Sequence, residues 1–247
     1  MSGHSKWSTI KHKKAATDAR RGKLFTKLLR EITVSARLGG GDPRGNPRLR
    51  AAMLEARANS VPGDNIDRAI KKGTGELEGE SYEEFTYEGY GPGGVAMIVE
   101  GLTDNRNRTA SEVRHLFSRH GGNLGETGCV AWMFKRRGFF ALEPGALDEE
   151  AFLELALDLG VDDVSTAGGE LEIYTAVEDY NRVREELERR ELPLAAKELA
   201  MVPDSTIGVA NPAQVLRLID ALEDQDDVQH VWANLEVDEG VLAAQEG

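Results

Sequence analysis

Residues 138–203 read GFFALEPGALDEEAFLELALDLGVDDVSTAGGELEIYTAVEDYNRVREELERRELPLAAKELAMVP, and strand and helix patterns alternate along them. Apolar residues recur at helical spacing over 147–159, behind the capping residue Asp148, and again over 177–190. Short runs of strand-forming residues occupy 139–142, 161–166, 171–175 and 195–202. The resulting order, βαββαβ, is that of the ferredoxin-like unit, so we expect a complete domain here.

The segments on both sides of this stretch supply the parts of a second unit of the same kind. Before it, strand patterns at 85–90, 94–102 and 129–135 accompany a helical pattern at 104–120. After it, the pattern predicts a helix at 212–222 and a strand at 228–237. We therefore expect an α+β protein in which the domain 138–203 is inserted into a discontinuous α/β domain, made of 79–137 plus 204–247.

The remaining segment, residues 1–78, differs from the rest in charge. The first 73 residues hold 17 Lys and Arg against 6 Asp and Glu, a net charge of +11. The following 174 residues hold 13 basic and 37 acidic residues, a net charge of −24. Such asymmetry within one chain predicts a polyanion-binding head on an acidic body.

Helical spacing in this basic segment predicts a small helical domain, 1–78, that binds nucleic acid. An apolar arc runs through 20–38, Gly39 to Gly41 end that helix, Asn46-Pro47 begins a second, and 62–73 form a short third. Trp7 is open to two readings, a base-stacking residue or a core anchor. The predicted nucleic-acid-binding residues are Lys6, Trp7, Lys11, Lys13, Lys14, Arg20, Arg21, Lys23, Lys27, Arg30, Arg37, Arg68, Lys71 and Lys72. Charge reversal at Lys23, Lys27 and Arg30 is expected to abolish binding and leave the fold intact.

Two further arginines, Arg106 and Arg108, stand in the first turn of the helix predicted at 104–120. The helix dipole disfavours cations at that end, so these side chains need partners elsewhere. The partners are either nucleic acid, which would make the pair a second anion contact, or carboxylates such as those of the Glu-rich linker. Both alternatives stay open at this point.

The sequence offers no set of residues with the spacing of a catalytic or metal site. Gly89 to Gly94 precede a strand, so they indicate a turn instead of a phosphate loop, and no P-loop motif occurs. The one cysteine, Cys129, has apolar neighbours, and the five histidines are scattered. We expect a protein that is not an enzyme, with no catalytic residues, metal or cofactor. One cysteine, no secretory signal and no membrane-spanning run favour the cytoplasm.

Several long motifs carry a resemblance to a known family. They are GHSKW (3–7), KHKKAATDARRGKLFTKLLREI (11–32), ARLGGGDP (36–43), NPRLR (46–50), AIKKG (69–73), YEGYGPGG (87–94), TDNRNRT (103–109) and GGNLGETGCVAWMF (121–134). In these the chain resembles the YebC/PmpR family, over nearly its whole length. The resemblance implies a bacterial cytoplasmic protein with a helical N-terminal domain and two ferredoxin-like domains, without catalytic residues. It also implies a DNA-binding transcriptional regulator or a factor that relieves stalling on the ribosome; mitochondrial relatives are translational activators of cytochrome oxidase.

Three functions fit these features to different degrees. The predicted one is a nucleic-acid-binding regulator of gene expression, of the DNA-binding transcriptional kind. The alternative is a translation factor associated with rRNA, whose acidic body faces basic ribosomal proteins; the lack of a clear helix-turn-helix favours backbone contacts of this sort. The third is an enzyme with a site between the acidic domains, which the net charge of −24 makes unsuitable for phosphate-bearing substrates.

Overall fold

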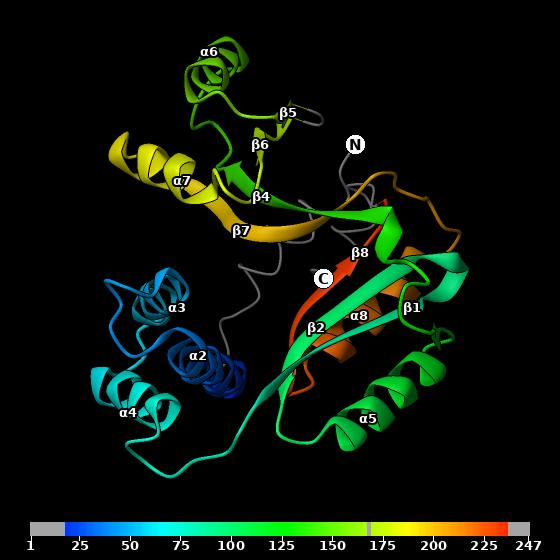
Figure 1. Cartoon of the computed structure of the whole chain (residues 1–247). Coiled ribbons are helices and arrows are strands. Elements are labelled where there is room, and N and C mark those ends of the chain that lie inside the picture. The colour runs from blue at the N-terminus through cyan, green and yellow to red at the C-terminus, as the bar shows by residue number, and fades with distance from the viewer. Residues whose placement is uncertain (1–17, 167–168, 237–247) are drawn as a thin grey trace.

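The computed structural model describes residues 18–166 and 169–236, which form a group of helices and two four-stranded sheets (Figure 1). Helices α2 (Asp18–Gly39), α3 (Pro47–Ala58) and α4 (Gly63–Thr74) pack around Ile32, Leu49 and Ile66. The side chain of Asn46 links helices α2 and α3 by hydrogen bonds. Its Oδ1 accepts the amide of Leu49 at 3.1 Å as the N-cap of α3, and its Nδ2 donates to the Ser35 carbonyl at 2.8 Å.

The second sheet is the ferredoxin-like unit that the sequence predicts. Its strands are β4 (Phe134–Leu142), β5 (Asp163–Ser165), β6 (Glu172–Thr175) and β7 (Leu194–Pro203), and its helices are α6 (Glu149–Leu159) and α7 (Tyr180–Arg189). The spatial order β5-β6-β4-β7 is antiparallel throughout. Phe140, Phe152 and Leu187, all fully buried, join the sheet to both helices.

The first sheet has the same spatial arrangement with a different chain order. Its strands β1 (Glu83–Tyr90), β2 (Ala96–Thr103), β3 (Asn123–Leu124) and β8 (Val228–Ala233) lie in the order β3-β1-β2-β8. Helices α5 (Arg106–Arg119) and α8 (Pro212–Glu223) pack on one face through Val113, Phe117 and Leu216. Here β1, which precedes β2 in the chain, stands where β6 stands in the other sheet. The α+β fold is confirmed.

The strand predicted at 129–135 is wrong. This segment contains a short 3₁₀ turn, η2 (Ala131–Met133), after which β4 begins in the second sheet. The cause is the buried carboxylate of Glu88, which accepts the amides of Gly128, Val130 and Ala131 at 2.7, 2.9 and 2.7 Å. Amides that converge on one carboxylate cannot also form a ladder, so the chain bends.

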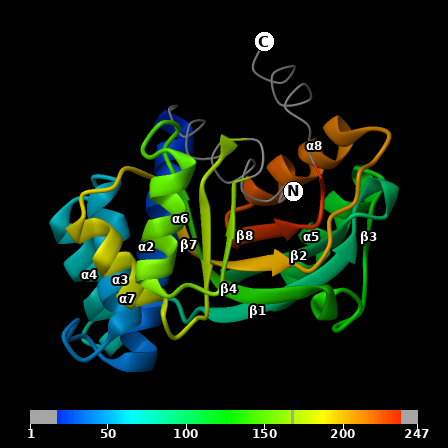
Figure 2. The ribbon, with the colours of Figure 1, turned by 90° about the horizontal axis from the view of Figure 1, so that it is seen from above.

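The two sheets pack against each other through the faces that carry no helices. Ile98 and Trp232 of the first sheet meet Phe139 and Ala200 of the second. The result is four layers, with α6 and α7 outermost on one side and α5 and α8 on the other (Figures 1 and 2). Over the ranges 18–166 and 169–236, every helix is too short or too polar to cross a membrane.

Candidate nucleic-acid interface

The predicted binding residues fall into three groups in the structure. Lys6, Trp7, Lys11, Lys13 and Lys14 lie outside the described residues, as does the side chain of Arg20. A second group lies along α2 and comprises Arg21, Lys23, Lys27, Arg30 and Arg37. The third lies on the last turns of α4 and comprises Arg68, Lys71 and Lys72.

Lys23, Lys27 and Arg30 of the α2 group contact residues 223–227, between α8 and β8, which read EDQDD, whereas Arg21 lies over the Phe25 ring. Lys23 Nζ lies 2.9 Å from Asp224 Oδ2 and donates to the carbonyl of the same residue at 2.9 Å. Lys27 Nζ donates to the Glu223 carbonyl at 2.6 Å. Segments about two hundred residues apart in the chain are thus held together by opposite charge. The EDQDD run was the sequence signal for this contact.

Asp227 is the centre of that contact and is only 1% exposed. Its Oδ1 accepts a hydrogen bond from Arg30 at 2.8 Å, and its Oδ2 accepts Arg108 at 2.8 Å and the Thr109 hydroxyl at 2.6 Å. Burial raises the pKa of this carboxyl, but the hydrogen bonds from Thr109 and Arg108 and the charges of Arg108 and Arg30 outweigh it, so the pKa is lowered. Asp227 therefore stays ionised and joins the N-terminal helices to the body.

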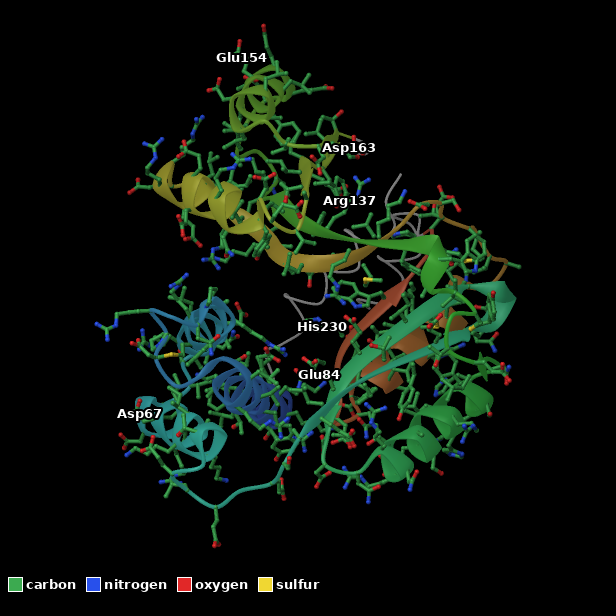
Figure 3. The ribbon with its side chains drawn as sticks, in the orientation of Figure 1. Asp67, Glu84, Arg137, Glu154, Asp163 and His230 are labelled. Atoms are coloured by element: carbon green, nitrogen blue, oxygen red, sulfur yellow. The ribbon has the colours of Figure 1, made fainter. Side chains whose placement is uncertain are left out.

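Arg106 and Arg37 also find partners within the chain. Arg106 Nε lies 2.6 Å from Glu83 Oε2, and Arg37 donates to the Ser81 hydroxyl at 2.7 Å and to the Tyr82 carbonyl. Glu84 of β1, labelled in Figure 3, forms an ion pair of 2.6 Å with Arg48 of α3. Of the two alternatives left open for Arg106 and Arg108, the structure provides the intramolecular carboxylates, on Glu83 for the first and on Asp227 for the second.

The α4 group faces solvent instead. Arg68, Lys71 and Lys72 are exposed, and within the described ranges none of them has a carboxylate within 4 Å. They occupy the outer side of α4, where Asp67 points away from the sheets (Figure 3). On the neighbouring helix α3, exposed Arg57 likewise has no ion pair among the described side chains. Sequence reasoning missed it because a single arginine in a mixed helix carries no pattern. We call Arg57, Arg68, Lys71 and Lys72 the α3–α4 face.

Catalytic or metal chemistry finds no support in the described residues. No group of three His, Cys, Asp or Glu side chains there could hold a metal ion. Burial and the charge of Glu88 raise the pKa of the Cys129 thiol, which makes it a weaker nucleophile at neutral pH. A groove of about 520 Å³ runs between α5 and α8, but Glu112 and Asp224 line it and would repel a phosphate group.

Comparison with known proteins identifies the family. Residues 5–76 match the model of the TACO1/YebC protein N-terminal domain, and residues 82–235 match that of the TACO1/YebC second and third domain. This chain belongs to the TACO1/YebC family. The resemblance found in the sequence is thereby confirmed, and the two matches together cover most of the chain.

Relatives of this family member are similar over their full length. The chain is 55% identical to a probable transcriptional regulatory protein of Syntrophobacter fumaroxidans, over 98% of each sequence. It is 54% identical to one of Chlorobaculum parvum, over 100% of this chain and 99% of that one. A crystal structure of a conserved hypothetical protein from Aquifex aeolicus, 50% identical, superposes with a TM-score of 0.84 over 94% of this chain and 97% of the other.

Proposed function

We propose that this protein is a regulator of gene expression that binds nucleic acid through its N-terminal helical domain. The observation that carries the proposal is the α3–α4 face, where four cations lie exposed and unpaired among the described residues of a chain whose net charge is −13. Cations that form no ion pair are available to phosphates, whose neutralisation releases condensed counterions. Relatives named as probable transcriptional regulatory proteins support the same role.

DNA is the target we propose first, because these relatives carry the name of transcriptional regulators. The contact itself is expected to be with the backbone. Lys71 and Lys72 occupy the last turn of α4 and Arg68 its middle, whereas a recognition helix reads bases with residues near its start. The same feature favours a second candidate, a translation factor on structured rRNA, which is recognised by phosphates and shape. In that case the acidic body would face basic ribosomal proteins.

We further propose that the role is binding without catalysis and that the protein acts in the cytoplasm. The family is labelled as regulatory, and its matched domains cover both the basic head and the acidic body. The third reading, an enzyme, would need converging acid and base groups. The one groove described above instead offers two carboxylates beside a histidine, with no nucleophile among its lining residues except Ser111.

A charge-neutral variant of the α4 cations tests the binding face. We expect R68Q/K71Q/K72Q to weaken binding to duplex DNA and to an RNA stem-loop, measured by fluorescence anisotropy over a range of salt concentrations. The slope of log affinity against log salt should fall by about 0.9 for each DNA phosphate that the variant no longer neutralises. The matched control, R182Q/R189Q/K197Q, removes the same charge from paired residues of the second sheet's unit. Equal affinities for the two triple variants would refute the assigned face.

Crosslinking in cells separates the two targets. We expect promoter DNA to be enriched with the wild-type protein and absent with R68Q/K71Q/K72Q. Enrichment of rRNA without promoter DNA would replace the transcriptional reading by the translational one.

A further inference from the structure

The acidic body contains a small set of arginines that form no ion pair with its described carboxylates. All 13 Lys and Arg of residues 74–247 fall within the described ranges, and they share that part of the chain with 37 Asp and Glu. Ten of them lie within 4.0 Å of a carboxylate. Arg114, Arg119 and Arg217 do not, as far as the described residues extend. With acidic residues so abundant, unpaired arginines are the exception in this body.

These three arginines all belong to one helical layer, Arg114 and Arg119 on α5 and Arg217 on α8. Helix α5 carries four arginines and one glutamate, so its own charge is +3 in a body of −24. Arg119 and Arg217, from different helices, act on the same imidazole: burial lowers the pKa of His120, and the positive charges of these two arginines lower it further. Gln214 of α8 donates to the His120 carbonyl at 3.0 Å and holds the two helices together at this point.

The exposed side of α5 is hydrophilic and open. Ser111, Glu112, Arg114, His115, Ser118 and Arg119 are all exposed, whereas Val113 and Phe117 are fully buried beneath them. At about 100° per residue, the exposed residues share one arc of the helix. The layer of α5 and α8 is the outermost one, on the side of the molecule opposite α6 and α7 (Figures 1 and 2). Nothing else in the described structure covers this surface.

The composition of this surface identifies the kind of partner. Large apolar side chains that are exposed in the described residues occur on other elements, for example Trp132 and Leu157, and none lies on α5 or α8. A protein interface usually buries such an anchor. Guanidinium groups and serine hydroxyls are, in contrast, the side chains that contact nucleic-acid phosphates. Charge complementarity therefore favours a phosphate backbone.

We propose that Arg114, Arg119 and Arg217 form a second nucleic-acid contact, in which the body binds the phosphate backbone of the molecule held by the N-terminal domain. This inference rests on the proposed function and deepens it. Neither the family descriptions nor the names of the relatives assign such a site. Arg106 and Arg108, for which the sequence left a second anion contact open as one of two alternatives, have guanidinium groups that are paired with carboxylates.

The test uses the full chain and three variants with equal loss of charge. They are R114Q/R119Q/R217Q, the α4 variant R68Q/K71Q/K72Q, and the control R182Q/R189Q/K197Q. The probes are a duplex DNA of arbitrary sequence and an RNA stem-loop, long enough to reach both surfaces. For the duplex, the salt slope of R114Q/R119Q/R217Q should fall by about 2.7 if each arginine meets one phosphate. Because all three side chains are exposed, thermal unfolding should match that of the control.

Each outcome of these binding measurements either supports or overturns the second contact. Weaker binding and a lower salt slope in R114Q/R119Q/R217Q, with the control unchanged, support the second contact. Wild-type affinity in that variant, with weaker binding in R68Q/K71Q/K72Q, overturns the second contact and leaves the proposed function standing. Absence of binding by the wild-type protein to both probes overturns the two together. A short probe bound equally well by wild type and by R114Q/R119Q/R217Q, where a long probe is not, would place the two contacts on separate surfaces and support the inference.

Discussion

Replacing Asp227 by asparagine should loosen the N-terminal helices from the body. The change removes a carboxylate that is 1% exposed and leaves Arg30, whose side chain is 15% exposed, without its anionic partner. A hydrogen bond to a charged group contributes about 1.5–3 kcal/mol. The contact with Arg108, 41% exposed, is screened and adds about 0–1 kcal/mol. The asparagine oxygen can still accept the Thr109 hydroxyl, so we expect a loss of about 2–4 kcal/mol in the free energy of unfolding.

Urea denaturation and calorimetry measure this loss, which corresponds to about 4–16 °C in melting temperature for a chain of this size. The control is Asp224→Asn, because that carboxylate is 65% exposed and its pair with Lys23 should contribute about 0–1 kcal/mol. A double-mutant cycle with Arg30→Gln isolates the contact between the domains. If Asp227→Asn costs no more than Asp224→Asn, or the cycle shows no coupling, Asp227 does not hold the domains together.

The carboxylate of Asp227 also makes the free energy of unfolding depend on pH. The pKa of Asp227 in the folded protein lies below the ordinary 3.8, so the unfolded chain binds the proton more readily. The stabilisation is complete above the ordinary value and is lost as the pH falls through the folded pKa. Asp227→Asn should therefore be most destabilising at neutral pH, and the difference from wild type should shrink below a pH of about 4. A constant difference across that range would contradict the assignment.

Three further substitutions test the packing of the domains. Glu88→Gln should destabilise by about 2–4 kcal/mol, because an amide replaces the charged acceptor of three backbone N–H groups, of which that of Val130 is buried. Faster hydrogen exchange at Val130 would locate the loss, and unchanged exchange would contradict it. Gly73→Ala should destabilise by about 2 kcal/mol or more, because its Cβ would lie 2.3 Å from the Thr33 carbonyl oxygen. Gly22→Ala, which meets open space inside α2, should instead stabilise by about 0.5–1 kcal/mol, and urea midpoints of the pair check both signs.

The fold was largely predictable because its signals are local. Helical spacing over 147–159 anticipated α6 at Glu149–Leu159, and the pattern over 104–120 anticipated α5 at Arg106–Arg119. The strand predicted at 129–135 failed for a reason that is not local. Its apolar run has strand composition, but Glu88, some forty residues earlier, binds the amides that the ladder would need. No window of sequence around Cys129 contains that carboxylate.

The site was less predictable, because a sequence shows which residues are charged but not which of them form ion pairs in the fold. The cations of α2 and α4 look alike in the sequence, yet Lys23, Lys27 and Arg30 of α2 contact residues 223–227 and the cations of α4 face solvent. The positive charges of Arg106 and Arg108 are unfavourable near the start of α5, where the helix dipole is positive. Ion pairs with Glu83 and Asp227 offset this cost. The unpaired arginines of the body, by contrast, give no local signal. They are recognised only after the other basic residues of the body, 74–247, have been matched to carboxylates.

This pairing changes what the charge reversal at Lys23, Lys27 and Arg30 would measure. Reversal places three carboxylates against the acidic turn 223–227, and the like charges would push the N-terminal helices away from the body. Failure of that variant to bind nucleic acid would then follow equally from weaker attraction to phosphates or from a displaced domain. The α3–α4 face and the arginines of α5 and α8 do not have this ambiguity, because their side chains hold no domain contact in the described structure. In the proposed arrangement, nucleic-acid binding and domain docking use different cations, so each can be removed while the other stays in place.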